Sequence, residues 1–137
     1  MSEASDAASV LFANEAFYLA FQSADADAMD RVWAKRANVS CLHPGWPPLI
    51  GRDAVMTSWR GILGNPSQQR VSVHGAHAEL HGGAAVVICF ETVGGFTLVA
   101  SNIFVREDGE WRLVHHQAGE TQAPPGGVPE GAARRLQ

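Results

Sequence analysis

The chain has 137 residues, of which 46% are hydrophobic and 18% charged, so it is long and apolar enough for one domain with a sizeable core. Ten Lys and Arg against 14 Asp and Glu give a formal charge of −4, which excludes a basic nucleic-acid-binding surface. The longest apolar run, residues 84–90, is too short to cross a bilayer. We therefore expect neither a nucleic-acid partner nor a membrane.

The start of the chain and its cysteines bear on the compartment. No charged and then apolar leader opens the sequence, and only two cysteines, Cys41 and Cys89, are present. Two cysteines do not imply a disulfide framework. We expect a cytoplasmic protein with reduced thiols.

Two helices are predicted in the first third of the chain. Residues 1–8 are rich in Ser, Ala and Asp, and we expect them to be a flexible N-terminus. From Ser9 onward an apolar stripe recurs at i, i+3, i+4, i+7 and i+8, formed by Ala13, Ala16, Phe17, Ala20 and Phe21. The sequence ADAD at 24–27 breaks this helix and offers an Asp cap for a second one, whose apolar face carries Met29, Val32 and Trp33.

A short strand and a third helix follow. Residues 39–43 predict the strand, which ends at the proline-rich segment 44–48. Gly51 then opens a helix that ends at Gly64, shortly before a proline.

The rest of the chain reads as strands up to a final tail. The Val-, Ile-, Thr- and Phe-rich segments are residues 69–74, 76–81, 84–92, 96–106 and 110–117. Gly75 is expected to bend a strand or form a bulge, and Asp108-Gly109 predicts a hairpin turn. Residues 120–137 are rich in Pro and Gly and are expected to be a flexible tail, which leaves residues 9–119 as the domain.

Helices followed by a run of antiparallel strands predict an α+β fold. Three N-terminal helices would pack in the concave face of a strongly curved, mostly antiparallel sheet. Where such a sheet bends enough, a pocket remains between the helices and the strands.

Several segments, in this order, resemble the SnoaL-like branch of the nuclear-transport-factor-2-like superfamily, over roughly residues 10–118. They are Phe17-Tyr18-Leu19-Ala20-Phe21, Met29 with Trp33, His43-Pro44-Gly45-Trp46, Gly51-Arg52-Asp53 with Ser58-Trp59, Ser101-Asn102-Ile103-Phe104-Val105 and Trp111-Arg112-Leu113-Val114-His115-His116. The resemblance implies a cone-shaped, cystatin-like α+β barrel with a deep pocket, and a homodimer formed through the outer sheet face. It leaves the reaction open, because this superfamily includes ketosteroid isomerase, polyketide cyclases, dehydratases, epoxide hydrolases and non-catalytic adaptors.

His43 is the first candidate for chemistry. Alternation along the predicted strand puts Val39, Cys41 and His43 on one face, with His43 at its pocket end. In the steroid isomerases that the chain resembles, an Asp-Pro pair ends the matching strand and its Asp is the general base. Here the pair is His43-Pro44, and an imidazole transfers protons at neutral pH. The alternative is that His43 orders the following loop.

Aromatic side chains are expected to line the pocket, namely Tyr18, Trp46 and Trp59, beside Cys41. Trp46 lies in a loop of Pro and Gly, where no regular element requires it. For Trp59, and also for Trp33 and Trp111, a simple place in the core is the competing interpretation.

His115 and His116 are neighbours on the last strand, so one points inward and the other outward. His115 shares its parity with Trp111 and Leu113, and we therefore expect it to be the inward one, leaving His116 as a further ligand contact. Asn102 shares a face with Phe104, and its amide would stabilise an enolate-like oxygen. The alternative is that Asn102 satisfies backbone groups of a bent strand.

Carboxylates of the kind that the related enzymes use have no visible counterpart here. The steroid isomerase base is replaced by His43, which makes strict steroid isomerase activity doubtful, and Glu91, near the end of its predicted strand, is expected to be solvated. Cysteine and histidine residues are present, but the spacing of structural zinc sites is absent, so no metal and no cofactor are expected.

The sequence thus predicts a SnoaL-like pocket domain for a small hydrophobic carbonyl or aromatic compound. As an enzyme it would perform cofactor-free isomerisation, cyclisation or dehydration, with His43, His115 and Asn102 as catalytic residues. The alternative is a non-catalytic ligand-binding or dimerisation module of the same fold.

Overall fold

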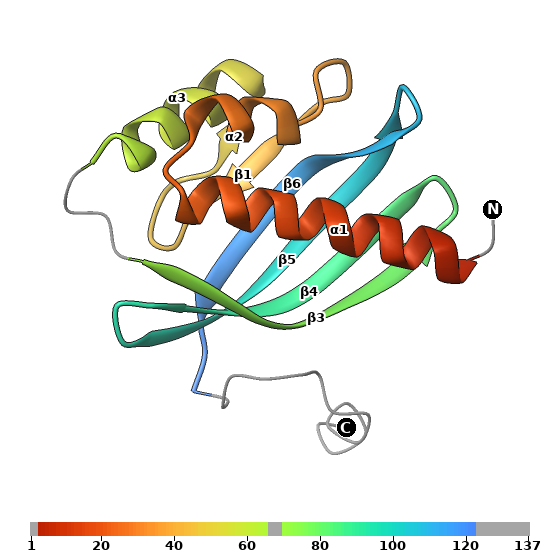
Figure 1. Ribbon diagram of the computed structural model, residues 1–137. Helices are drawn as coiled ribbons and strands as arrows, with labels where there is room; N and C mark the ends of the chain where they lie inside the picture. Colours follow the sequence, from red (N-terminus) through yellow and green to blue (C-terminus); the bar gives the residue numbers. More distant parts are fainter. Residues whose placement is uncertain (1–2, 66–69, 123–137) are drawn as a thin grey trace.

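The computed structural model describes residues 3–65 and 70–122. Three helices and six strands make up this part of the chain (Figure 1): α1 Glu3–Gln22, α2 Ala26–Val32, β1 Ser40–Leu42, β2 Leu49–Ile50, α3 Arg52–Leu63, β3 Val71–His81, β4 Ala84–Val93, β5 Phe96–Glu107 and β6 Glu110–Glu120. No helix among these residues is both long and apolar enough to span a bilayer.

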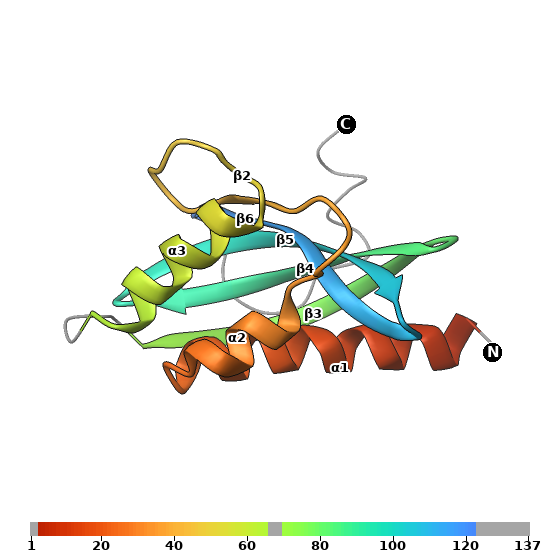
Figure 2. The same ribbon diagram turned by 90° about the horizontal axis from the view of Figure 1, so that it is seen from above.

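The six strands form one mixed sheet in the order β2-β1-β6-β5-β4-β3. Strands β3 to β6 are successive antiparallel neighbours, and β1 joins them by pairing parallel to β6. Helix α1 crosses the sheet and contacts β3, β4 and β6, and α2 lies on the same side (Figures 1 and 2). The α+β, cystatin-like architecture expected from the sequence is confirmed.

The core lies between α1 and the concave side of the sheet. On α1 the residues Val10, Asn14, Phe17 and Tyr18 are buried, whereas Phe12 on the opposite side is exposed. The helix begins at Glu3, six residues before Ser9, because the turn before Ser9 continues the same hydrogen-bonded helix. Residues 3–8, which were expected to be flexible, therefore belong to α1.

Other bounds also differ from those expected. Strand β6 continues to Glu120, where it still pairs with Leu98 of β5. The two-residue strand β2 has no pattern in the sequence that announces it, since it forms only by pairing with β1. The bend expected at Gly75 is present as a register shift between His74 and His77. Of the predicted tail, residues 123–137 lie outside the described residues.

The segment between α2 and β1 is held by two charged side chains. The buried Glu107 carboxylate accepts hydrogen bonds from three successive backbone N–H groups, those of Lys35, Arg36 and Ala37, at 2.8, 2.9 and 3.2 Å. The Arg52 guanidinium donates to the backbone carbonyls of Asp30, Trp33 and Ala34. These contacts fix where the chain enters β1. They therefore also help to fix the position of His43, the residue that follows β1.

Replacing Glu107 by Gln therefore tests the attachment of this segment. A Gln amide keeps one carbonyl acceptor but places an NH2 group where the other carboxylate oxygen accepts a backbone N–H, so we expect E107Q to lower the free energy of unfolding by about 1–3 kcal/mol in urea titrations. The control is E110Q on the same hairpin, because the exposed Glu110 carboxylate pairs with Arg112, at 3.0 Å, and holds no backbone segment among the described residues. We expect E110Q to stay within about 0.5 kcal/mol of the wild type, and equal losses in the two variants would contradict this account.

Candidate functional site

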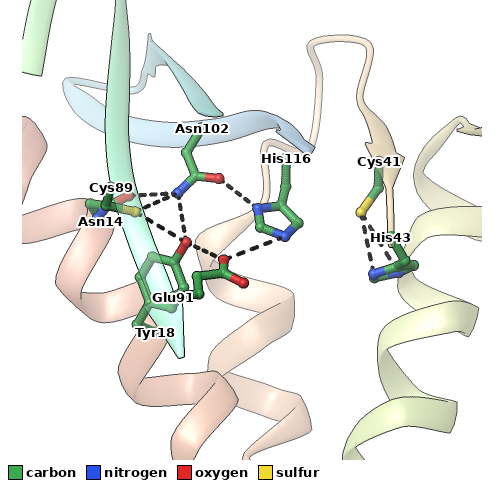
Figure 3. A network of polar contacts seen from close by, with 8 residues as sticks. All are labelled: Asn14, Tyr18, Cys41, His43, Cys89, Glu91, Asn102 and His116. Carbon is green, nitrogen blue, oxygen red and sulfur yellow. Dashed lines mark hydrogen bonds and ion pairs between the residues drawn. The ribbon is translucent and has the colours of Figure 1, made fainter. Parts of the chain in front are cut away.

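Six buried side chains from α1, β4, β5 and β6 form a connected network, here called the core polar cluster (Figure 3). Its members are Asn14, Tyr18, Cys89, Glu91, Asn102 and His116, each 2% exposed or less. The secondary structure explains why these residues face the same way. Asn14 and Tyr18 are one turn apart on α1, and Cys89 and Glu91 are two residues apart on β4, so each pair shares a face. Asn102 and His116 are direct partners across β5 and β6.

Asn102 is the centre of this cluster. Its Nδ2 donates to Asn14 Oδ1 at 2.9 Å and to the Tyr18 hydroxyl at 3.2 Å, and its Oδ1 lies 2.5 Å from His116 Nδ1. Because a carbonyl oxygen only accepts, His116 carries its proton on Nδ1. The free lone pair of His116 is therefore on Nε2, which lies 3.9 Å from Glu91 Oε2.

Glu91 and Tyr18 form a short hydrogen bond in the middle of the core. The Tyr18 hydroxyl donates to Glu91 Oε2 at 2.5 Å. Burial raises the pKa of Glu91, and the bond from Tyr18 only partly offsets this. Burial likewise raises the pKa of Tyr18, with the nearby Glu91 adding to the shift. Both effects favour the protonated, uncharged forms.

His116 is also uncharged. Burial, together with the smaller effects of the neighbouring His43 and His115, lowers its pKa to about 3. The close approach of His116 to Glu91 is thus a contact between two neutral groups rather than an ion pair, since desolvation opposes the charged form of each. A neutral base and a neutral acid stand side by side in a dry core.

His43, directly after β1, is buried next to this cluster, with its ring centroid 6.5 Å from that of His116. Its Nε2 lies 2.9 Å from Ser58 Oγ, which donates its own proton to the carbonyl of Val55 at 2.6 Å. Ser58 therefore accepts from His43, whose proton is on Nε2 and whose lone pair is on Nδ1. Burial lowers the pKa of His43 to about 4. The Cys41 sulfur lies 3.9 Å from Nδ1 and 3.7 Å from Nε2.

Aromatic rings enclose both histidines. The Trp59 ring centroid lies 4.9 Å from that of His43 and 5.9 Å from that of His116, and the two imidazoles are 6.5 Å apart. Phe17 packs on His116 at 5.0 Å. Within the described part of the chain, the Trp59 indole N–H has no regular hydrogen-bond acceptor, and the Cys41 sulfur beside it is a weak one.

Most residues expected at the site are brought together, but His115 is not. Its Nδ1 bonds Ser40 Oγ at 2.7 Å on the other side of β6, and His116 is the inward histidine. The reason is a bulge: Ile103 pairs with His115, but the next residue of β5, Phe104, pairs with Leu113. The extra residue, Val114, reverses the alternation that would have put His115 beside Leu113 on the inner face.

Glu91 is a second residue whose position differs from the one expected. It is 2% exposed instead of solvated, because β4 continues to Val93 and Glu91 pairs with the buried Leu98. The alternation along β4 would have shown this, because Glu91 lies two residues after Cys89 and four after Val87, on the same inner face. Burial raises the pKa of Cys41, the other thiol near the site, to about 12, so it is an unreactive neighbour.

Trp46 covers His43 from the outside. It lies in the segment between β1 and β2, its ring centroid is 4.8 Å from that of His43, and it is 46% exposed. The hollow expected around His43 is therefore packed with the rings of Trp46 and Trp59. A groove of about 1070 Å³ lies elsewhere, on the outer side of α1, and includes neither histidine. The described residues contain no group of three or more His, Cys, Asp or Glu arranged to hold a metal.

Comparisons with known proteins agree with this architecture. The SnoaL-like domain family matches residues 10–119. A crystal structure from Streptomyces avermitilis, named as a "putative dehydratase" of the NTF2-like family, is similar over 89% of this chain and 100% of its own, with 31% identity and a TM-score of 0.80. A "putative calcium/calmodulin-dependent protein kinase type II association domain" from Thiobacillus denitrificans has 34% identity over 80% of this chain and 93% of its own, with a TM-score of 0.68.

A curated relative is more distant. The F-box protein SKIP8 of Arabidopsis thaliana is 23% identical over 111 residues, which are 80% of this chain. The match spans 48% of the length of that protein, so it concerns only a part of it.

The buried histidines predict a loss of stability in mild acid. In the folded state His43 and His116 stay neutral down to a pH of about 4 and about 3, whereas in the unfolded chain they take up protons below 6.5. The unfolded state thus binds more protons over this window, and stability falls as the pH falls. Each histidine contributes a slope of up to about 1.4 kcal/mol per pH unit.

Glu91 acts in the opposite direction, since its raised pKa lets the folded state keep a proton that the unfolded state loses above 4.5. Urea unfolding between pH 6.5 and 4.5 should therefore give a steeper slope in E91Q than in the wild type, and a shallower one in H43Q. A free energy of unfolding in E91Q that does not change over this window would contradict two buried neutral histidines.

Proposed function

Because the chain belongs to the SnoaL-like domain family, we propose that it performs cofactor-free acid–base chemistry, of the isomerase, cyclase or dehydratase type, on a small hydrophobic carbonyl or aromatic compound. The observation that carries the proposal is the pair of neutral histidines, His43 and His116, held in defined tautomers within one aromatic enclosure. Buried titratable groups with shifted pKa values are typical of active sites.

The proposed reaction begins with removal of a proton from the carbon next to a carbonyl. His43 Nδ1 is the base, since its lone pair is free while Nε2 is bonded to Ser58. The carbonyl oxygen is stabilised by a neutral donor, for which the carboxyl group of Glu91 is suited by its raised pKa, while the Tyr18 hydroxyl already donates to Glu91 and holds it in place. Return of the proton to another carbon completes an isomerisation, and loss of a β-hydroxyl group as water completes a dehydration.

The roles differ from those first expected for Asn102 and His115. Both N–H groups of Asn102 are already bonded, to Asn14 and Tyr18, so it acts as a positioning residue and does not donate to the substrate. His116, with its lone pair on Nε2 facing Glu91, takes the place considered for His115. The indole N–H of Trp59, which among the described residues faces only the weak acceptor Cys41, is a further donor for a ligand oxygen.

Access to His43 requires Trp46 to move. Its ring packs on His43 from the solvent side while nearly half of its surface is exposed. Displacing Trp46 would therefore cost less buried apolar area than displacing the fully buried Trp59. A flat apolar substrate would replace this ring contact with one of its own. The similarity to the putative dehydratase of Streptomyces avermitilis, at 31% identity, also supports a reaction of this class.

The proposal is tested by proton exchange on simple ketones. Cyclohexanone and acetophenone incubated with the protein in D2O should exchange their α-protons faster than in buffer, as followed by NMR. H43Q and H116Q should lower this rate by about 10²–10⁴-fold, the usual contribution of a positioned acid or base. The matched control is H115Q, which changes the adjacent histidine on the other side of β6 and should leave the rate unchanged.

Circular dichroism and thermal unfolding establish that each variant is folded. The variant S58A keeps the His43 ring but frees its Nε2, so the rate should fall less than in H43Q. Full exchange activity in folded H43Q would contradict the role of His43. Absence of exchange in the wild type, over a panel of ketones that includes β,γ-unsaturated and β-hydroxy compounds, would favour the second candidate.

The second candidate is a non-catalytic ligand-binding or association module that forms a homodimer through the outer sheet face. That face is apolar: Val86 pairs with Ile103 and Phe90 with Val99 across β4 and β5, and Val99 is 39% exposed. The similarity to the putative association domain of Thiobacillus denitrificans, at 34% identity, favours this candidate, and a dimer is compatible with the enzyme as well.

Sedimentation of the wild type and of V99E tests the dimer. A charge on the apolar outer face should convert a dimer to a monomer, because an unpaired charge is costly to bury. T57E, at an exposed position of α3, is the control and should sediment as the wild type does. A monomeric wild type, or a dimer that survives V99E, would argue against this interface.

A further inference from the structure

An open groove runs along the outer side of α1, on the face opposite to the core. Its walls come from α1, α2 and the hairpin between β5 and β6, which lie side by side at this edge of the molecule (Figures 1 and 2). Its lining includes the large apolar residues Phe12 and Leu19 and the basic residues Arg31, Lys35, Arg106 and Arg112. We call it the α1 groove.

The α1 groove follows α1 over most of the length of the helix. Its lining extends along α1 from Ser5 to Ser23, which at 1.5 Å per residue is roughly 27 Å of helix. Its volume of about 1070 Å³ exceeds that of most small-molecule pockets. A trough of this length fits an extended or helical segment better than a compact ligand.

The floor of the α1 groove is apolar and unusually exposed. Phe12 is 74% exposed and Leu19 is 62% exposed, and both are large side chains on the same side of α1 as Ala16. Two large apolar residues two turns apart on one helix face, with alanine between them, offer the spaced contacts that an amphipathic helix uses at i, i+3, i+4 and i+7.

The rim of the α1 groove is basic, although the chain as a whole has a charge of −4. Four of the chain's ten Lys and Arg side chains line this groove, against two carboxylates, those of Asp25 and Glu110. Arg106 pairs with Asp6 and Arg112 with Glu110. Arg31 and Lys35 form no ion pair with any residue that the structure describes. Two unpaired cations thus lie beside an exposed apolar floor.

We propose that the α1 groove binds an amphipathic helix of a partner protein, with its apolar face on Phe12 and Leu19 and acidic residues next to Arg31 and Lys35. A second copy of this chain is a poorer occupant, since a two-fold contact through the same patch would bring the cations of both copies together. The groove shares no residue with the His43 and His116 site, so the inference is independent of the proposed reaction.

The test uses a synthetic acidic probe. A fluorescently labelled peptide of repeated Leu-Glu-Glu-Leu-Leu-Glu-Ala heptads, three heptads long to match the groove, is titrated with the full-length protein and followed by anisotropy. The same peptide with Lys in place of Glu, and a scrambled peptide, are the probe controls. Saturable binding of the acidic helix alone is the expected result, and binding should weaken with added salt.

Paired variants locate the contact. The double charge reversal R31E with K35E, and separately F12S, should each weaken binding about tenfold or more. The controls are R60E, at an exposed cation of α3 outside the groove, and F96S, at an exposed Phe (61%) outside the groove. Both controls should bind the peptide as the wild type does. Because Phe12, Arg31 and Lys35 are exposed, all of these variants should fold.

Several results would overturn the proposal. They are absence of saturable binding, equal binding of the Glu and Lys peptides, or equal losses in the groove variants and their controls. Laurate as a small anionic amphiphile is tested in parallel: if it binds at Phe12 while the acidic peptide does not, the groove takes a small molecule and not a helix. Self-association abolished by R31E with K35E would identify a second copy as the occupant, which also overturns it.

Discussion

The side chain of Asn102 is the constraint on which the rest of the core depends. A primary amide that is fully buried must satisfy two donors and an acceptor without water. It does so with Asn14 and Tyr18 from α1 and with His116 from β6, so one group joins the helix to two strands. The distance between α1 and the sheet, the orientation of Tyr18 and the tautomer of His116 all follow from this arrangement.

Burial away from water also determines the protonation states of the ionisable groups in the core. Desolvation opposes ionisation of each acid and base in the core, so Glu91 and Tyr18 hold their protons while His116 and His43 lack theirs. The Trp59 ring packs against both histidines and so shields them from water. Well-packed apolar side chains are often as stabilising as buried acids and bases in such positions. Their presence is therefore an argument for chemistry.

The sequence was sufficient for the fold, but not for the arrangement of the candidate site. Of the core polar cluster it singled out Tyr18, Asn102 and His116, and not Asn14, Cys89 or Glu91. Long strands, paired glycines and apolar helix faces are local signals, and they predicted the elements well. The face of His116 depends on a bulge at Val114, which arises from pairing with β5 and leaves no mark in the sequence of β6. Glu91 was misjudged for a related reason, because the length of β4 is decided by its partner Leu98. Strand β2 likewise exists only through β1.

The most direct measurement is the tautomeric state of His43 and His116 at neutral pH, read from the nitrogen chemical shifts and couplings of ¹⁵N-labelled imidazoles in the intact protein. The account predicts two uncharged rings of opposite tautomer, with the proton on Nδ1 of His116 and on Nε2 of His43. Two charged imidazolium rings, or the same tautomer at both positions, would contradict it.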